Sequence, residues 1–131
     1  MKENILFLIT FFIATTAFAQ SPDMGIDAAD AATLATNTTV TIKDKVSQVS
    51  HKINDSGEDV IYVNFGKNWP NNSFTLIINK PYFYLFPDVD KLLNKFVEVE
   101  GKTGIYHYKN LEEGYTSAPC ILMTSSAQLR Y

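Results

Sequence analysis

The feature that most constrains the fold is a series of five short stretches of β type between residues 39 and 123. They are rich in β-branched and aromatic residues, and turn-forming residues separate them. They lie at residues 39–49, with a bend near Asp44, and at 59–65, 73–79, 96–108 and 120–123. Residues 88–95 instead predict a short helix, because Asp88 is a suitable N-cap and basic residues lie toward the end. The order is therefore three strands, a helix and two strands.

This order predicts a mainly β fold, a five-stranded OB-type Greek-key barrel with the short helix between the third and fourth strands. An unrelated β-sandwich is the alternative, but a lone helix at that position argues against it. We place the barrel domain at residues 38–131. Before it, residues 20–37 form a leader rich in Ala, Asp and Thr, in which Asp27 suits the N-cap of a short helix. A flexible leader is the competing interpretation.

Residues 1–19 have the three parts of a secretory signal peptide. Lys2 precedes an apolar run at 5–13, and a small-x-small pattern ends at Ala19, which predicts Gln20 as the new N-terminus. The alternative is a membrane anchor, but a spanning helix needs about 20 apolar residues, more than this run supplies. We therefore predict a periplasmic or secreted protein with no membrane span after cleavage.

The charge balance and the cysteine count narrow the possible partners. The net charge is −3 and Arg130 is the only arginine, which disfavours phosphate-driven binding of nucleic acid. The only cysteine is Cys120, so no internal disulfide can form. It lies in an apolar stretch, which predicts a buried inert thiol and no structural zinc site. No cofactor is expected.

One block of sequence carries a family resemblance. Residues 64–66 read Asn-Phe-Gly, residues 69–71 read Trp-Pro-Asn, and Phe74-Thr75 then open an aliphatic run. This block resembles the core of a bacterial OB-type family that is found in exported proteins and is loosely described as nucleic-acid-binding. The resemblance implies an OB-type barrel and single-stranded nucleic acid as one ligand. The sequence departs from the family at Asp44, where glycine is usual, and in an additional segment at 111–117.

Strand alternation assigns side chains of the second and third strands to two faces. The predicted inward set is apolar: Ile61, Val63, Phe65, Phe74, Leu76 and Ile78. The predicted outward set is Tyr62, Asn64, Thr75 and Ile77. OB-type barrels bind oligomers on this outer surface. The predicted ligand-binding residues are Tyr62, Asn64, Lys67, Trp69, Thr75 and Lys80.

Within that set, Trp69 and Tyr62 would stack on a base or a sugar ring, and the two lysines would meet a phosphate or a carboxylate. The structural alternatives are that Trp69 caps one end of the barrel and that Tyr62 is ordinary strand surface. The aromatic segment 82–86 predicts packing of the helix, or in a second hypothesis the contact surface for a partner protein.

Catalytic patterns are weak. Glu98 and Glu100 share one face of a strand, a spacing also found in inverting glycosidases, but alternating acids on a solvated strand are far commoner. His51 and His107 have no metal-ligand spacing. We therefore predict a non-catalytic exported module that binds an oligomeric ligand. The alternative is a structural or protein-interaction protein of the bacterial envelope.

Overall fold

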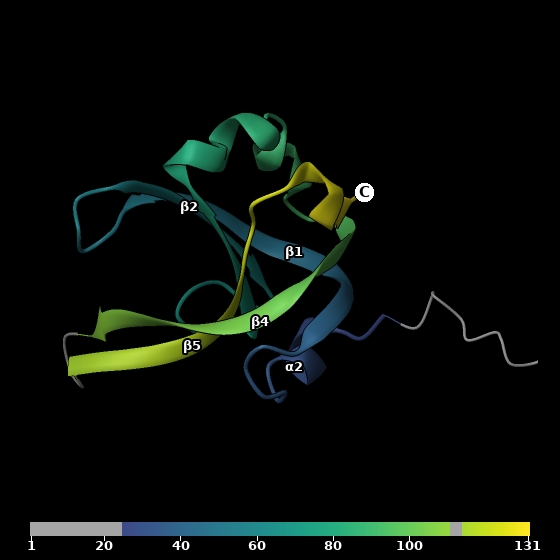
Figure 1. Cartoon of the computed structure of the whole chain (residues 1–131), viewed down its shortest axis with the longest axis horizontal. Coiled ribbons are helices and arrows are strands. Elements are labelled where there is room, and N and C mark those ends of the chain that lie inside the picture. The colour runs from purple at the N-terminus through teal and green to yellow at the C-terminus, as the bar shows by residue number, and fades with distance from the viewer. Residues whose placement is uncertain (1–24, 111–113) are drawn as a thin grey trace, which may run out of the picture.

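The computed structural model describes residues 25–110 and 114–131 (Figure 1). The predicted signal peptide at 1–19 lies outside these residues. The described elements, in chain order, are α2 (Ala28–Ala31), β1 (Thr39–Ile53), β2 (Asp59–Phe65), β3 (Phe74–Asn79), the 3-10 helices η2 (Lys80–Leu85) and η3 (Val89–Leu92), β4 (Phe96–Asn110), β5 (Gly114–Leu122), the 3-10 helix η4 (Ser126–Gln128) and β6 (Leu129–Arg130). The fold is therefore mainly β, as predicted.

The six strands form one mixed sheet in the order β1-β2-β3-β5-β4-β6, and β1 also pairs with β4. That additional pairing closes the first five strands into a ring. The contact between β3 and β5 is parallel, at Thr75–Ile77 against Cys120–Leu122, and the other pairings are antiparallel. The short strand β6 extends the sheet beyond β4 and was not predicted.

Strand β1 belongs to both sides of the ring because it changes partner along its length. Residues Thr39–Lys45 pair with β4, and Val46–Ile53 pair with β2. The register with β2 shifts between Val46 and Gln48, a bulge that bends the strand. The predicted bend near Asp44 thus lies close to the position where β1 leaves one partner for the other.

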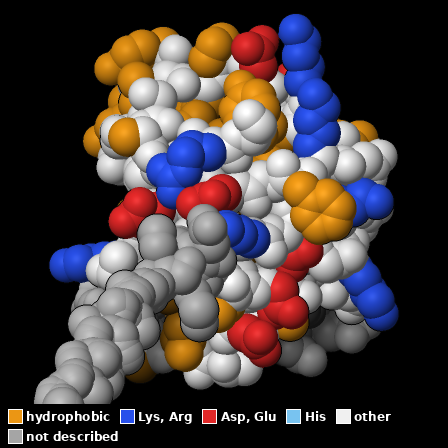
Figure 2. Space-filling view, turned by 90° about the vertical axis from the view of Figure 1, so that its right-hand side faces the viewer, with side chains coloured by type: hydrophobic (Ala, Val, Ile, Leu, Met, Phe, Trp, Pro, Cys, Tyr) orange, Lys and Arg blue, Asp and Glu red, His pale blue; other side chains and the backbone are white. Residues whose placement is uncertain are grey.

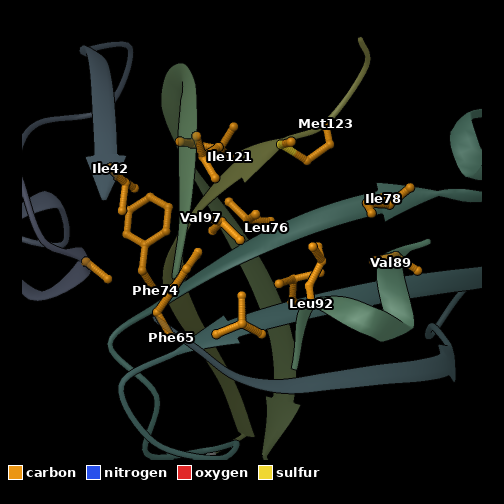
Figure 3. Packing of buried hydrophobic residues seen from close by; sticks show 14 of the residues in the cluster. Ile42, Phe65, Phe74, Leu76, Ile78, Val89, Leu92, Val97, Ile121 and Met123 are labelled. Atoms are coloured by element: carbon orange, nitrogen blue, oxygen red, sulfur yellow. The ribbon is translucent and has the colours of Figure 1, made fainter. Parts of the chain in front are cut away.

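The interior of the ring holds the main hydrophobic core (Figure 3). All six side chains that the alternation assigned to the interior are buried: Ile61, Val63, Phe65, Phe74, Leu76 and Ile78. Ile42 from β1, Val97 from β4 and Ile121 from β5 meet them from the other strands. Leu92 and Val89 from η3 close one end of the core.

The side chains predicted to face outward are less exposed to solvent than predicted. Asn64, Thr75 and Ile77 point away from the main core, yet only 1%, 0% and 7% of their surfaces are exposed. Other parts of the chain cover them, including Asn72 from the β2–β3 loop and Tyr106 from β4. The prediction of two open rows of side chains is therefore wrong. Only Tyr62 in this set keeps partial exposure.

The helices are shorter than predicted. In the leader, α2 forms a single turn, and the Asp27 carboxylate accepts a hydrogen bond from the Asp30 N–H at 2.8 Å. The helix predicted at 88–95 is a 3-10 helix over Val89–Leu92, and Asp88 makes no capping hydrogen bond. It ends early because Leu93 is extended and Asn94 adopts a φ of 67°. Within the described residues, no helix is long and apolar enough to cross a membrane.

Candidate binding cleft

Two long hairpins, β1–β2 and β4–β5, project from the ring toward the same side of the molecule (Figure 1). Between them lies a cleft of about 680 Å³. Its residues come from both hairpins, from the outer face of β2 and β3, and from the β2–β3 loop: Gln48, Ser50, Lys52, Ile53, Asn54, Asp55, Ser56, Val60, Tyr62, Asn64, Trp69, Ile77, Asn79, Tyr106, His107, Tyr108 and Leu122. The volume is typical of a small-molecule binding site.

Four aromatic rings form one continuous cluster along this cleft, and we call it the aromatic wall: Tyr62, Trp69, Tyr106 and Tyr108. The Trp69 and Tyr108 rings meet edge to face, with their centroids 4.3 Å apart. Tyr106 lies 6.1 Å from Tyr62 and 6.3 Å from Trp69, measured between ring centroids. Trp69 is 39% exposed, so the wall presents ring surface to solvent while its members hold one another in place.

A network of hydrogen bonds beneath the wall holds the Trp69 loop against β1 and β2. The side-chain oxygen of Gln48 accepts hydrogen bonds from the Trp69 backbone N–H at 2.8 Å and from Asn64 Nδ2 at 2.9 Å. The Thr75 hydroxyl donates to Asn64 Oδ1 at 2.8 Å. Asn72 Nδ2 donates to Thr75 Oγ1 at 2.7 Å and to Asn64 Oδ1 at 3.2 Å. The buried polar groups of Asn64 and Thr75 are thus satisfied within the protein.

Burial keeps the ionisable groups at the base of the cleft neutral. It raises the pKa of Tyr106 to about 12 and that of the Cys120 thiol to about 11. The pKa of Tyr62 is also raised, first by burial and then by the negative charge of Asp55. At neutral pH both phenols are therefore protonated hydrogen-bonding groups, and Cys120 is an unreactive thiol packed with Val60 and Ile77.

The structure brings together some of the predicted ligand-binding residues and not others. Tyr62, Asn64 and Trp69 line the cleft, and Thr75 lies in the network beneath it. The two lysines do not line the cleft. Lys67 is exposed beyond the end of β2, and Lys80 lies 3.6 Å from Asp59 in an exposed ion pair. The structure therefore does not bring Lys67 and Lys80 into the cleft with the other predicted residues.

Three residues that the sequence did not identify complete the site: Gln48, Tyr106 and Tyr108. The two tyrosines lie two positions apart on β4, where they pair with Ala118 and Thr116 of β5. Their alternation was visible in the sequence as Tyr-His-Tyr. The sequence does not show their contact with Trp69, because this contact depends on the β4–β5 hairpin reaching the β2–β3 loop, which is distant in sequence. Trp69 therefore packs against a hairpin at the side of the cleft.

The other polar candidates have structural partners. Arg130 Nη2 lies 2.6 Å from Glu98 Oε2 and 3.9 Å from Glu100 Oε1, and neither glutamate lines the cleft. A hydrogen bond from Arg130 lowers the pKa of Glu98. His51 Nε2 lies 2.8 Å from the Asp90 carboxylate. In the described part of the chain, no group of three or more metal-ligating side chains is close enough to hold an ion.

Comparison with known proteins gives no assignment: neither the family models nor the curated proteins include a match to this chain.

Proposed function

We propose that this protein is a non-catalytic, exported OB-type module that binds an oligomeric ligand in the cleft between its hairpins. The ring of pairings β1-β2-β3-β5-β4-β1 supports an OB-type barrel. OB-type barrels bind oligonucleotides and oligosaccharides on the face of strands 2 and 3, between the loops that connect strands 1–2 and 4–5. The cleft occupies the equivalent position here, since its base is β2 and β3.

The observation that carries the proposal is the aromatic wall. Large apolar residues on a monomer are ordinarily buried or scattered, whereas here four rings from β2, β4 and the β2–β3 loop line one concave surface. Rings that are held in place before binding lose little conformational entropy when a flat ligand group stacks on them. The network around Gln48 and Asn64 supplies that rigidity.

A non-catalytic role agrees with the chemistry of the lining. Among the described residues that line the cleft, Asp55 is the only carboxylate, and Arg130 pairs with Glu98 and Glu100 elsewhere. The pattern at residues 1–19 adds export to the proposal, and with it a periplasmic or extracellular location.

Because Trp69 is the only tryptophan, its fluorescence reports directly on the cleft. We expect its emission to change when the purified protein is titrated with one of several oligomers: single-stranded DNA, neutral and acidic oligosaccharides, and an unstructured peptide. The corresponding monomer should bind far more weakly. The Tyr62→Ala variant should lose most of the affinity. Unchanged emission with every oligomer would contradict the proposal.

A second candidate function is an interaction protein of the bacterial envelope. Tyr84 in η2 is 77% exposed, and Figure 2 shows hydrophobic side chains gathered at the upper end of one face, the end at which η2 and η3 lie in Figure 1. This candidate predicts a crosslinked partner in cells that is lost in the Tyr84→Ala variant. A partner retained in that variant would remove its support.

A further inference from the structure

We infer that the ligand of the cleft is a neutral oligosaccharide, an inference that rests on the proposed function and narrows it to one chemical class. It follows from three properties of the lining: its charge, its unused hydrogen-bonding groups and its aromatic wall.

The charge of the cleft does not suit a polyanion. Among the described residues that line the cleft, Lys52 and Asp55 carry opposite formal charges, and these cancel. Binding of nucleic acid draws on several Lys or Arg contacts to phosphates. The lysines that the sequence suggested for this purpose, Lys67 and Lys80, do not line the cleft. Asp55 moreover places a negative charge close enough to Tyr62 to raise its pKa.

Backbone N–H groups can also bind phosphate, but in the turn at the tip of the β1–β2 hairpin they already donate hydrogen bonds within the turn. The Asn54 side-chain oxygen accepts hydrogen bonds from the N–H groups of Ser56 and Glu58, at 2.9 and 3.0 Å. The Gly57 N–H donates to the Asn54 carbonyl at 2.9 Å. This turn therefore offers no ring of free N–H groups to an anion.

Neutral hydrogen-bonding groups, in contrast, remain available in the cleft. Within the described part of the chain, the side chains of Ser50, Ser56 and Asn79 line the cleft and make no hydrogen bond. Hydroxyl and amide groups both donate and accept, which matches the hydroxyl groups of a sugar. Because these groups are solvated before binding, new hydrogen bonds to a ligand leave no buried group without a partner.

The aromatic wall supplies the complementary contact. One face of a pyranose ring carries several C–H groups, and it packs flat on an aromatic ring without needing a charge. Trp69 and Tyr108 meet edge to face, and Tyr62 and Tyr106 extend the wall along β2 and β4. Successive sugar units can thus contact successive rings, which explains why an oligomer would bind better than a monomer.

Calorimetric titration of the full-length mature protein tests the inference. The probes are uncharged hexamers of glucose, with α-1,4, β-1,4 or β-1,3 linkages, and of N-acetylglucosamine. A thymidylate dodecamer and a galacturonate hexamer are the anionic comparators. We expect at least one neutral hexamer to bind with an affinity that changes little between low and high salt, whereas a phosphate-driven mode would weaken steeply with salt.

Variants separate the contributions. Tyr108→Ala should weaken binding of the neutral hexamer about tenfold, as expected for loss of one stacking ring. Tyr84→Ala is the matched control, since Tyr84 is an exposed tyrosine that does not line the cleft, and it should bind normally.

The outcomes distinguish this inference from the proposed function. Binding of a neutral hexamer that is lost in Tyr108→Ala supports both. Binding of only an anionic probe, again lost in Tyr108→Ala, overturns the neutral-sugar inference and leaves a binding module. Binding of a neutral hexamer that is unaffected by Tyr108→Ala overturns the inference, because the sugar then lies elsewhere. Failure of every probe in this titration overturns the inference, and failure of the unstructured peptide as well contradicts the proposed function.

Discussion

At the scale of single residues, Gln48 connects two parts of the cleft. One side-chain oxygen accepts hydrogen bonds from the Trp69 N–H and from the Asn64 amide, and so joins the loop to the floor. An alternating pattern marks Gln48 only as a polar residue on a strand. Its role follows from the bulge at Val46–Gln48, which changes the register of β1 against β2.

We predict that Gln48→Ala loosens the Trp69 loop. Loss of this acceptor leaves a partly buried donor unsatisfied, which costs about 1–3 kcal/mol of unfolding free energy. Urea unfolding measures that loss, and the emission of Trp69 should shift to the red as its ring becomes more hydrated. Ser50→Ala is the control, because the Ser50 side chain lies on the same strand and makes no hydrogen bond in the described residues. Equal stability of the two variants would show that Gln48 does not hold the loop.

We also predict that the stability falls as the pH rises from about 10 to about 12. The pKa of Tyr106 is raised from 10.0 to about 12 by burial, so the unfolded chain loses this proton at lower pH than the folded protein. Tyr62 acts in the same direction because its pKa is also raised. Urea unfolding across this range should show a shallower decline for Tyr106→Phe. A parallel decline in the two proteins would mean that Tyr106 ionises normally.

At the scale of secondary-structure elements, the sequence predicts the positions of β1 to β4 well. It misplaces the start of β5, which begins at Gly114 and not at residue 120, and it predicts contacts between strands poorly. The second strand has the predicted bounds, and its alternation with β3 identifies the inward side chains correctly. The outer face was misjudged because Asn64 and Thr75 are polar, and polar side chains on a strand usually indicate solvent. Here they satisfy each other and Asn72. The early end of η3 was also missed, because it depends on the left-handed backbone of Asn94.

The close approach of Gly101 in β4 to Ile121 in β5 gives a prediction at this scale. A Cβ atom at Gly101 would lie 2.7 Å from the Ile121 side chain, which is fully buried. Gly101→Ala should therefore destabilise the protein by about 1–3 kcal/mol through overpacking. Gly104→Ala is a matched control on the same strand, where the nearest contacts of a new Cβ are 3.8 and 3.9 Å. Thermal unfolding distinguishes them, and equal effects of the two substitutions would contradict the packing described for Gly101.

At the scale of the whole molecule, closure of the ring and the projection of two hairpins explain how a chain without an internal disulfide presents a defined cleft. The core fills the ring, so the outer face of β2 and β3 is left for a second layer of contacts. The net charge is −3, and among the described residues that line the cleft the formal charges of Lys52 and Asp55 are opposite. The location of the cleft could not be predicted from the sequence, because it depends on the register of β1, which changes its pairing partner midway along its length.

Export is also a property of the whole molecule. When the full chain is produced in a bacterial host, we predict a mature protein that begins at Gln20 and is recovered from the periplasm or the medium. Mass spectrometry of the intact protein measures this directly. A protein that keeps residues 1–19 and stays in the membrane fraction would favour the alternative of an N-terminal anchor.

The position of the ligand is the central claim, and amide chemical shifts on addition of a bound oligomer test it most directly. We predict that the largest ¹H–¹⁵N shifts fall on Tyr62, Trp69, Tyr106 and Tyr108, and that Tyr84 and Glu98 stay unperturbed. Shifts centred on Tyr84 or Glu98, with the four cleft residues unchanged, would contradict the account.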